Sequence, residues 1–99
     1  MDVTVVIQGQ VFEWDQDKAA ENLRKHRISF EEACEVFFDP FVQHVDASSE
    51  DEPREAAIGM TETWNHLFVV HVIRHEDTIR IISARPITPQ ERRTHEDDE

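Results

Sequence analysis

The sequence predicts an α+β fold: a compact domain with an antiparallel sheet of about four to five strands, two N-terminal helices and a short C-terminal helix. Three observations support this prediction. Runs of β-favouring residues occupy most of residues 1–14 and 41–83. Two helix-start signals lie between these runs, and Pro89 suits the first turn of a final helix.

The first strand is expected to end at Trp14, with residues 3–7 as a candidate extension of it. Asp15 then stands where a helix N-cap belongs, and this predicts a helix over residues 16–25. The spacing of apolar positions indicates which residues of this helix are buried. They are Ala19, Ala20 and Leu23.

The second helix has a stronger start signal. Ser29 is followed three residues later by Glu32, which is a full capping box and predicts a helix through about Phe37. Asp39 precedes Pro40 and is therefore disfavoured in the α region, so the helix ends there. Four strands are expected after this point, over residues 41–45, 56–60, 67–73 and 78–83, with residues 75–77 as the tight connection between the last two.

The length and composition fit one domain over residues 1–99, with a core from about residue 11 to 95. The chain has 99 residues, of which 38% are apolar, enough for one modest core. No apolar run approaches the roughly 18 residues of a membrane span, and the first residues lack the features of a signal peptide. A cytoplasmic protein without membrane contact is expected. The single cysteine, Cys34, is expected to be a small buried hydrophobe.

The formal net charge is −12, which would ordinarily oppose binding to nucleic acid. The acids are concentrated in two segments, the predicted loop over residues 46–55 and the tail over residues 96–99. In contrast, five of the ten Lys and Arg residues lie between Arg74 and Arg93. The acidic segments therefore need not touch the cationic one.

Two arginines of the last predicted strand point to opposite faces. The period of two over residues 78–85 separates Arg80 from Arg85. Arg85 ends the strand immediately before Pro86, where a folded scaffold can hold its guanidinium group at the edge of a cleft. This position predicts phosphate binding by Arg85.

An ordered set of residues from Phe12 to about Glu96 resembles the BrnT family of toxins. The matching residues are Phe12-Glu13-Trp14-Asp15, Lys18, Asn22, Lys25-His26, Ser29-Phe30-Glu31-Glu32-Ala33, Phe38-Asp39-Pro40, Ile58-Gly59, Val69-Val70-His71, Arg74, Arg80 to Arg85, and Glu91-Arg92. Two positions depart from the family pattern: Arg27 replaces a common Gly, and His95 replaces an aromatic residue.

The resemblance implies a RelE-like fold and a ribonuclease activity that arrests translation. It also implies neutralisation by a BrnA-like antitoxin with a ribbon-helix-helix part, so that the protein meets operator DNA only through its antitoxin. The alternative function is a degenerate, non-catalytic toxin fold that binds an antitoxin or another protein and contributes to operon autoregulation.

Cleavage of RNA without a metal ion uses the ribose 2′-hydroxyl as nucleophile, and it needs a base, an acid and cations for the charge on the phosphorane. Arg85 and Arg74 are the candidate cations. His71 or His26 is the candidate for proton exchange, and Lys25 for positioning the substrate. The candidate RNA-binding residues are Arg92, His95 and Arg80.

Each of these residues also has a structural interpretation. Arg80 can pair with a neighbouring strand, and Arg85 can form a salt bridge with Glu91 or Glu13. Lys25 and His26 favourably meet the negative end of a helix dipole. His71 lies among aliphatic residues and can be a core histidine.

No metal site and no cofactor are expected. His66, His71 and His75 follow one another at spacings of five and four, which cannot place all three on one face of a strand. A metal-dependent nuclease needs clustered carboxylates. In this chain the acids cluster in the predicted loop and tail.

Overall fold

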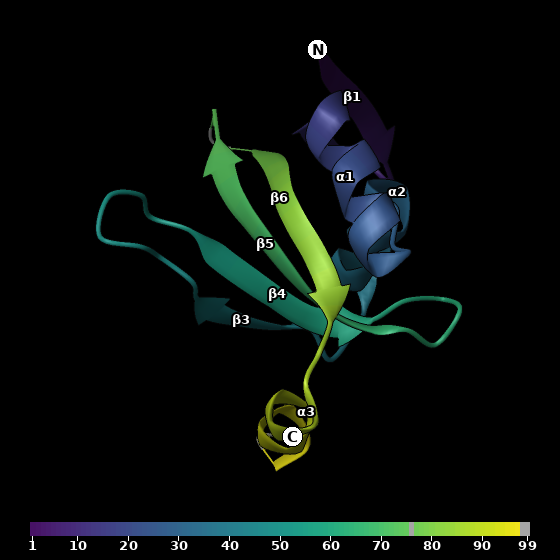
Figure 1. The fold of residues 1–99 in the computed structure, drawn as a ribbon, viewed down its shortest axis with the longest axis vertical. Helices are drawn as coiled ribbons and strands as arrows, with labels where there is room; N and C mark the ends of the chain where they lie inside the picture. The colour runs from purple at the N-terminus through teal and green to yellow at the C-terminus, as the bar shows by residue number, and fades with distance from the viewer. Residues whose placement is uncertain (76, 98–99) are drawn as a thin grey trace.

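The computed structural model of the chain describes residues 1–75 and 77–97, the last four by their backbone alone. Three helices, one 3-10 helix and a six-stranded sheet form the described part (Figure 1). The elements in chain order are β1 (Asp2–Ile7), β2 (Gln10–Asp15), α1 (Gln16–His26), α2 (Phe30–Cys34), the 3-10 helix η1 (Glu35–Phe38), β3 (Gln43–Asp46), β4 (Glu55–Met60), β5 (His66–Arg74), β6 (Thr78–Pro86) and α3 (Pro89–Asp97).

The α+β class agrees with the sequence prediction, but the sheet is larger than predicted and is mixed. Its strand order is β1-β2-β6-β5-β4-β3, and β2 runs parallel to β6, with Phe12 opposite Ile79. The other neighbouring strands are antiparallel. The candidate extension, residues 3–7, belongs to a separate strand, because Gln8 and Gly9 both have positive φ and turn the chain into a hairpin.

Helix α1 begins at the predicted residue, but the face that it turns toward the core is not the predicted apolar one. The Asp15 carboxylate accepts a hydrogen bond from the backbone N–H of Lys18, as an N-cap should. Leu23 is 48% exposed and Ala20 is also exposed, so the prediction that they are buried is wrong. The buried residue of this helix is Asn22, because its side chain bonds to the backbone of β6.

Ser29 caps α2 through a hydrogen bond from the backbone N–H of Glu32 to its hydroxyl. The α-helix ends at Cys34, and the chain continues as η1 to Phe38, one residue beyond the predicted end. The Glu32 carboxylate does not complete the capping box. It instead accepts hydrogen bonds from the side chains of Thr61, Thr63 and Asn65 and so ties α2 to the turn before β5.

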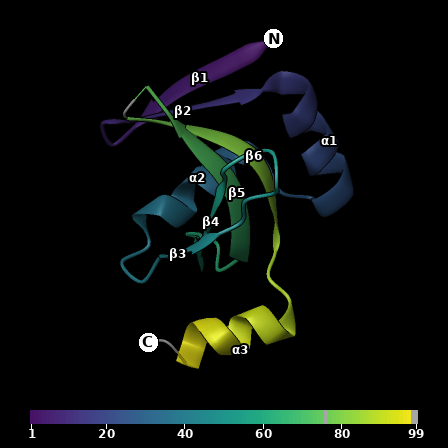
Figure 2. The same ribbon diagram turned by 90° about the vertical axis from the view of Figure 1, so that its left-hand side faces the viewer.

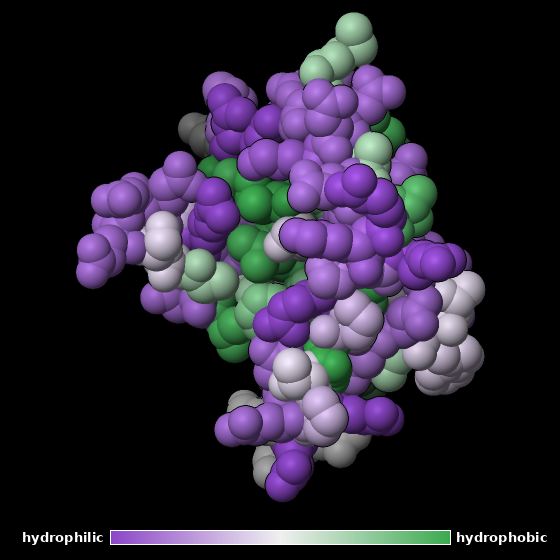
Figure 3. Space-filling model, viewed as in Figure 1, coloured by the Kyte–Doolittle hydropathy of each residue, from purple (hydrophilic) through white to green (hydrophobic). Residues whose placement is uncertain are grey.

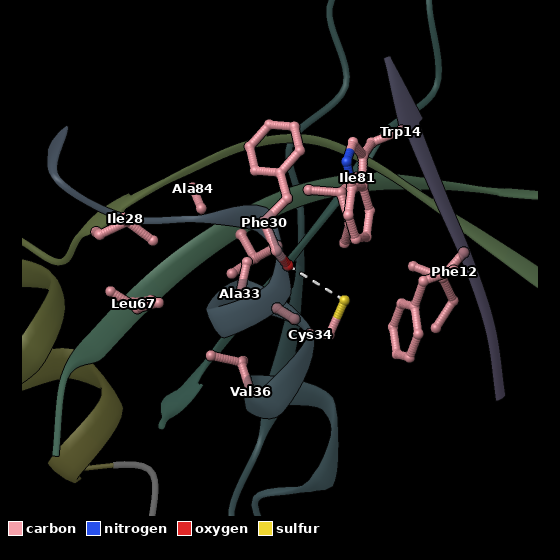
Figure 4. Close-up of a cluster of buried hydrophobic side chains, with 13 residues drawn as sticks. Phe12, Trp14, Ile28, Phe30, Ala33, Cys34, Val36, Leu67, Ile81 and Ala84 are labelled. Carbon is pink, nitrogen blue, oxygen red and sulfur yellow. Dashed lines mark hydrogen bonds between the residues drawn. The ribbon is translucent and has the colours of Figure 1, made fainter. Parts of the chain in front are cut away.

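The core lies between the sheet and the two N-terminal helices (Figure 4). Trp14 and Phe30 meet edge to face, with ring centroids 5.9 Å apart. Cys34 is fully buried as predicted, and its Sγ contacts the carbonyl oxygen of Phe30 at 3.2 Å. Burial raises the pKa of the Cys34 thiol to about 12, which makes this cysteine a poor nucleophile.

Helix α3 stands apart from the rest of the fold, at the end of β6 (Figures 1 and 2). Figure 3 shows the surface in the view of Figure 1. Hydrophobic residues gather over β5 and β6, and the rest of this face is mainly hydrophilic. Among the residues described, no helix has the length and apolar character needed to cross a membrane.

Candidate active site

The guanidinium group of Arg85 is held from two sides at the C-terminal end of β6. Its Nη1 and Nη2 donate to the two carboxylate oxygens of Glu91, each at 2.9 Å. The Arg85 Cζ lies 4.2 Å from the centroid of the Phe68 ring, in cation–π geometry. The salt bridge with Glu91 is one of the two structural pairings that the sequence allowed for Arg85, and together with Phe68 it holds the guanidinium group in place.

Glu91 also determines where α3 begins. Its carboxylate accepts a hydrogen bond from the Thr88 backbone N–H at 2.9 Å, and the Thr88 hydroxyl accepts one from the Glu91 N–H at 3.1 Å. This reciprocal pair is a capping box. Hydrogen bonds from Arg85 and from Thr88 lower the pKa of Glu91 to about 2, so its carboxylate is charged at neutral pH.

Part of the Arg85 guanidinium group remains available to a ligand. A third described hydrogen bond runs from Nη1 to the Pro86 carbonyl oxygen at 3.2 Å. Of the five N–H donors, the Nε–H and one N–H of Nη2 have no partner among the described residues. The side chain is 36% exposed. Arg85 can therefore bind an anion through this second edge while Glu91 holds the first.

The C-terminal end of α1 brings further cations toward the same end of β6, on the same side of the molecule as the chain that leads to α3 (Figure 2). Lys25 is largely exposed, with its Nζ 3.9 Å from the Glu21 carboxylate. His26 and Arg27 line a hollow of about 190 Å³ whose wall includes Pro86, the residue that accepts the Arg85 hydrogen bond. The Arg85 side chain itself points to the other face of the sheet, because Arg85 alternates with Ala84, which lies in the core. Lys25, His26, Arg27 and Arg85 thus surround the end of β6 from both faces, and these four residues are called the basic corner below.

Arg27 belongs to the basic corner, although it is not among the site residues predicted from the sequence. It follows α1 with φ of 61°, in the left-handed region, and its N–H bonds to the Leu23 carbonyl oxygen. A non-glycine residue in this region costs about 1 kcal/mol. The signal in the sequence was Arg27 itself, which stands where the resemblance described above leads one to expect Gly.

Asn22 holds the two halves of the basic corner together. Its Nδ2 donates to the carbonyl oxygens of Ile28 and Ala84, at 3.0 and 2.9 Å, and its Oδ1 accepts from the Ala84 N–H at 3.1 Å. These bonds join α1, the connection to α2 and the residue before Arg85. All of these groups are buried.

Arg74 and Arg80 lie at the opposite end of the sheet. Both donate to the Glu13 carboxylate, at 3.3 and 2.6 Å, and Arg80 also pairs with Asp2. Arg80 and Arg85 are five residues apart on β6, which corresponds to roughly 16 Å. The structure therefore does not bring Arg74 and Arg80 together with Arg85, and it gives Arg80 the strand-pairing role considered from the sequence.

His71 lies in the core with a side chain that is 1% exposed. Its Nδ1 is 3.1 Å from the Val69 carbonyl oxygen, and burial lowers its pKa. Direct contact with RNA would require this part of the sheet to open. The ring faces His44 and Glu55 of the neighbouring strands, a grouping that the spacing of histidines along one strand did not reveal.

The candidate RNA-binding residues of α3 follow Glu91. Arg92 is exposed, and its backbone N–H bonds to the Thr88 carbonyl oxygen. The predicted contact through His95 lies outside the described residues, because the structure gives only the backbone there.

Comparison with known families identifies the chain. Residues 14–91 match the sequence model of a family described as the ribonuclease toxin, BrnT, of type II toxin-antitoxin systems. The chain belongs to the BrnT family. A comparison with curated proteins finds no match. The BrnT match includes the whole basic corner, Asn22 and Glu91, and ends just before Arg92.

Proposed function

We propose that this chain is an endoribonuclease toxin that cleaves RNA without a metal ion and thereby inhibits translation. The observation that carries this proposal is the BrnT match over residues 14–91. The basic corner supports it, because it combines an exposed edge of a fixed guanidinium group with a histidine at a hollow. These are the groups that metal-free phosphoryl chemistry uses.

In the proposed reaction the ribose 2′-oxygen attacks the adjacent phosphorus. The bond from phosphorus to the 5′-oxygen breaks, which leaves a 2′,3′-cyclic phosphate and a 5′-hydroxyl. His26 exchanges protons with the reacting oxygens, because its ring nitrogens can accept a proton from the 2′-hydroxyl and donate one to the leaving 5′-oxygen. Arg85 and Arg27 hold the charge on the phosphorane, and Lys25 positions the substrate. Arg92 is placed to meet the neighbouring backbone.

We also propose that a BrnA-like antitoxin with a ribbon-helix-helix part neutralises the chain. The chain would then contact operator DNA only through that antitoxin. The net charge of −12 favours a basic partner surface, since opposite charges steer association. We expect this toxin to act in the cytoplasm.

A non-catalytic module is the second candidate function. The observation that favours it is that Arg74, Arg80 and Arg85 are each paired with a carboxylate of the same chain. Such pairs reduce the positive potential available to RNA. Under this alternative the fold is kept for binding an antitoxin.

The distinguishing experiment incubates the purified chain with a labelled RNA oligonucleotide in EDTA. We expect fragments that end in a 2′,3′-cyclic phosphate. In cells, we expect expression of the chain alone to slow growth and deplete RNA. An identical oligonucleotide with a 2′-O-methyl group at each ribose should remain intact. If the RNA stays intact and the chain still binds its antitoxin, the non-catalytic module is the correct function.

A further inference from the structure

The side chains of His44, Glu55 and His71 meet on one face of three neighbouring strands. Glu55 of β4 lies directly opposite His71 of β5. His44 of β3 lies opposite Ala57, two residues along β4 from Glu55 and therefore on the same face. One possible ligand atom from each of the three side chains lies within 4.8 Å of the others.

The His71 ring is arranged as metal-binding histidines usually are. Its Nδ1 lies 3.1 Å from the Val69 carbonyl oxygen, which places the proton on Nδ1 and the lone pair on Nε2. The Nε2 atom is buried and has no hydrogen-bond partner among the described residues. It lies 3.6 Å from the Glu55 carboxylate, beyond hydrogen-bonding distance. A buried lone pair without a donor is costly, and a bound cation would satisfy it.

We propose that His44, Glu55 and His71 bind a zinc-type divalent cation. Two imidazole nitrogens and one carboxylate oxygen form a three-ligand set that Zn²⁺ accepts, with water as the fourth ligand. Ligand atoms of a tetrahedral zinc ion lie about 3.3 Å apart, so the site closes on the ion by small movements of His44 and Glu55. Both of these side chains are exposed and can move, while His71 is fixed.

The surroundings fit this ion. The Phe37 ring lies 4.8 Å from the His71 ring, edge to face, and 6.3 Å from the His44 ring, so an apolar wall orients both imidazoles. On the open side, His44 and Glu55 line a pocket of about 480 Å³, through which the ion and its water can enter. This zinc site links β3, an edge strand of four residues, to β5.

The zinc site is separate from the basic corner. His71 is opposite Ile81, and Arg85 lies four residues farther along β6, roughly 13 Å at the usual rise of a strand. Zinc binding can therefore be measured without measuring RNA cleavage.

The test uses the full chain, freed of metal with a chelator and titrated with ZnCl₂ in a calorimeter. We expect one tight zinc ion per chain, a rise in Tm of several degrees, and zinc-dependent shifts of the His71 ring resonances in NMR spectra. His44→Gln and Glu55→Gln change exposed side chains and should each weaken zinc binding at least tenfold. The matched control is His75→Asn, which alters an exposed histidine elsewhere and should leave the affinity unchanged.

Three results would overturn the proposal. The first is wild-type protein that binds no zinc at micromolar concentration. The second is unchanged affinity in both His44→Gln and Glu55→Gln. The third is an equal loss in His75→Asn, which would show that zinc binds to dispersed surface groups of an acidic chain.

Discussion

Glu91 joins Arg85 to the beginning of α3. One carboxylate accepts two hydrogen bonds from the guanidinium group and one from the Thr88 N–H, so the cation at the end of β6 and the cap of the last helix share a single partner. Any phosphate that binds Arg85 must use the edge that Glu91 leaves, or must displace Glu91.

Removal of the Glu91 charge is therefore expected to strengthen RNA binding. Glu91→Gln keeps a hydrogen-bonding side chain but no longer neutralises Arg85, and a partly exposed pair of this kind is worth about 1 kcal/mol. We expect the Kd for a 2′-O-methyl oligonucleotide to fall about fivefold, as measured by fluorescence anisotropy at low salt. The control is Glu13→Gln, which removes the carboxylate that Arg74 and Arg80 share and leaves Arg80 paired with Asp2. An equal gain in RNA affinity in Glu13→Gln would show that RNA binding depends on the net charge of the protein and not on Arg85.

The attachment of α3 should depend on pH. The pKa of Glu91 is lowered from 4.5 to about 2, so its charged form stabilises the folded state above pH 4.5. This contribution is lost as the pH falls from 4.5 toward 2, because the unfolded chain takes up a proton at Glu91 near pH 4.5 while the folded chain does so only near pH 2. We expect the backbone NMR resonances of Thr88 and Glu91 in the folded wild type to shift with a midpoint near pH 2, and those of Glu91→Gln not to shift. A midpoint near 4.5 in the wild type would contradict the pairing.

Arg27 is expected to reduce stability while it contributes to RNA binding. Its φ of 61° suits glycine, so Arg27→Gly should raise the free energy of unfolding by about 0.5–1 kcal/mol in urea denaturation. The same change removes a cation from the basic corner and should weaken RNA binding several-fold. Arg24→Gly, in the middle of the last turn of α1, should instead lower stability, because glycine is a poor helix former. A stabilised Arg27→Gly variant with unchanged RNA affinity would exclude Arg27 from the site.

Asn22 is expected to be the most sensitive polar residue of the core. Asn22→Ala leaves the Ala84 N–H and two carbonyl oxygens buried without their partner, which should cost about 3 kcal/mol of unfolding free energy. Gln16→Ala, on the exposed start of the same helix, should change it by less than about 0.5 kcal/mol. Similar losses in both variants would show that α1 is stabilised by its helix propensity and not by its attachment to β6.

The local signals in the sequence were sufficient for most helix and strand positions. The Asp15 and Ser29 caps are formed as predicted, because they depend on residues three positions apart. The parallel pairing of β2 with β6 was missed, since it joins residues far apart in the sequence. The buried face of α1 was also missed, because hydropathy does not show the hydrogen bonds that carry Asn22 into the core.

The same distinction applies to the candidate site. The position of Arg85 near the end of its strand followed from neighbouring residues, and Glu91 was one of the two partners, with Glu13, that the sequence allowed for it. The pairing of Arg74 and Arg80 with Glu13 could not be predicted in the same way, because Glu13 lies on β2, which is far from β6 in the sequence although the two strands are neighbours in the sheet. The grouping of His44 with His71 required the register of three strands, which no motif records.

The most direct test compares RNA cleavage by Arg85→Ala and Arg80→Ala in EDTA. Both variants remove one arginine from β6, so they are matched in charge, and Arg80→Ala breaks two ion pairs where Arg85→Ala breaks one. The account predicts that Arg85→Ala lowers kcat by about 10²–10³-fold while it remains folded, since it removes a charged donor to the phosphorane. Arg80→Ala should retain the rate within about twofold. Equal rates in the two variants would contradict the assignment of RNA cleavage to the basic corner.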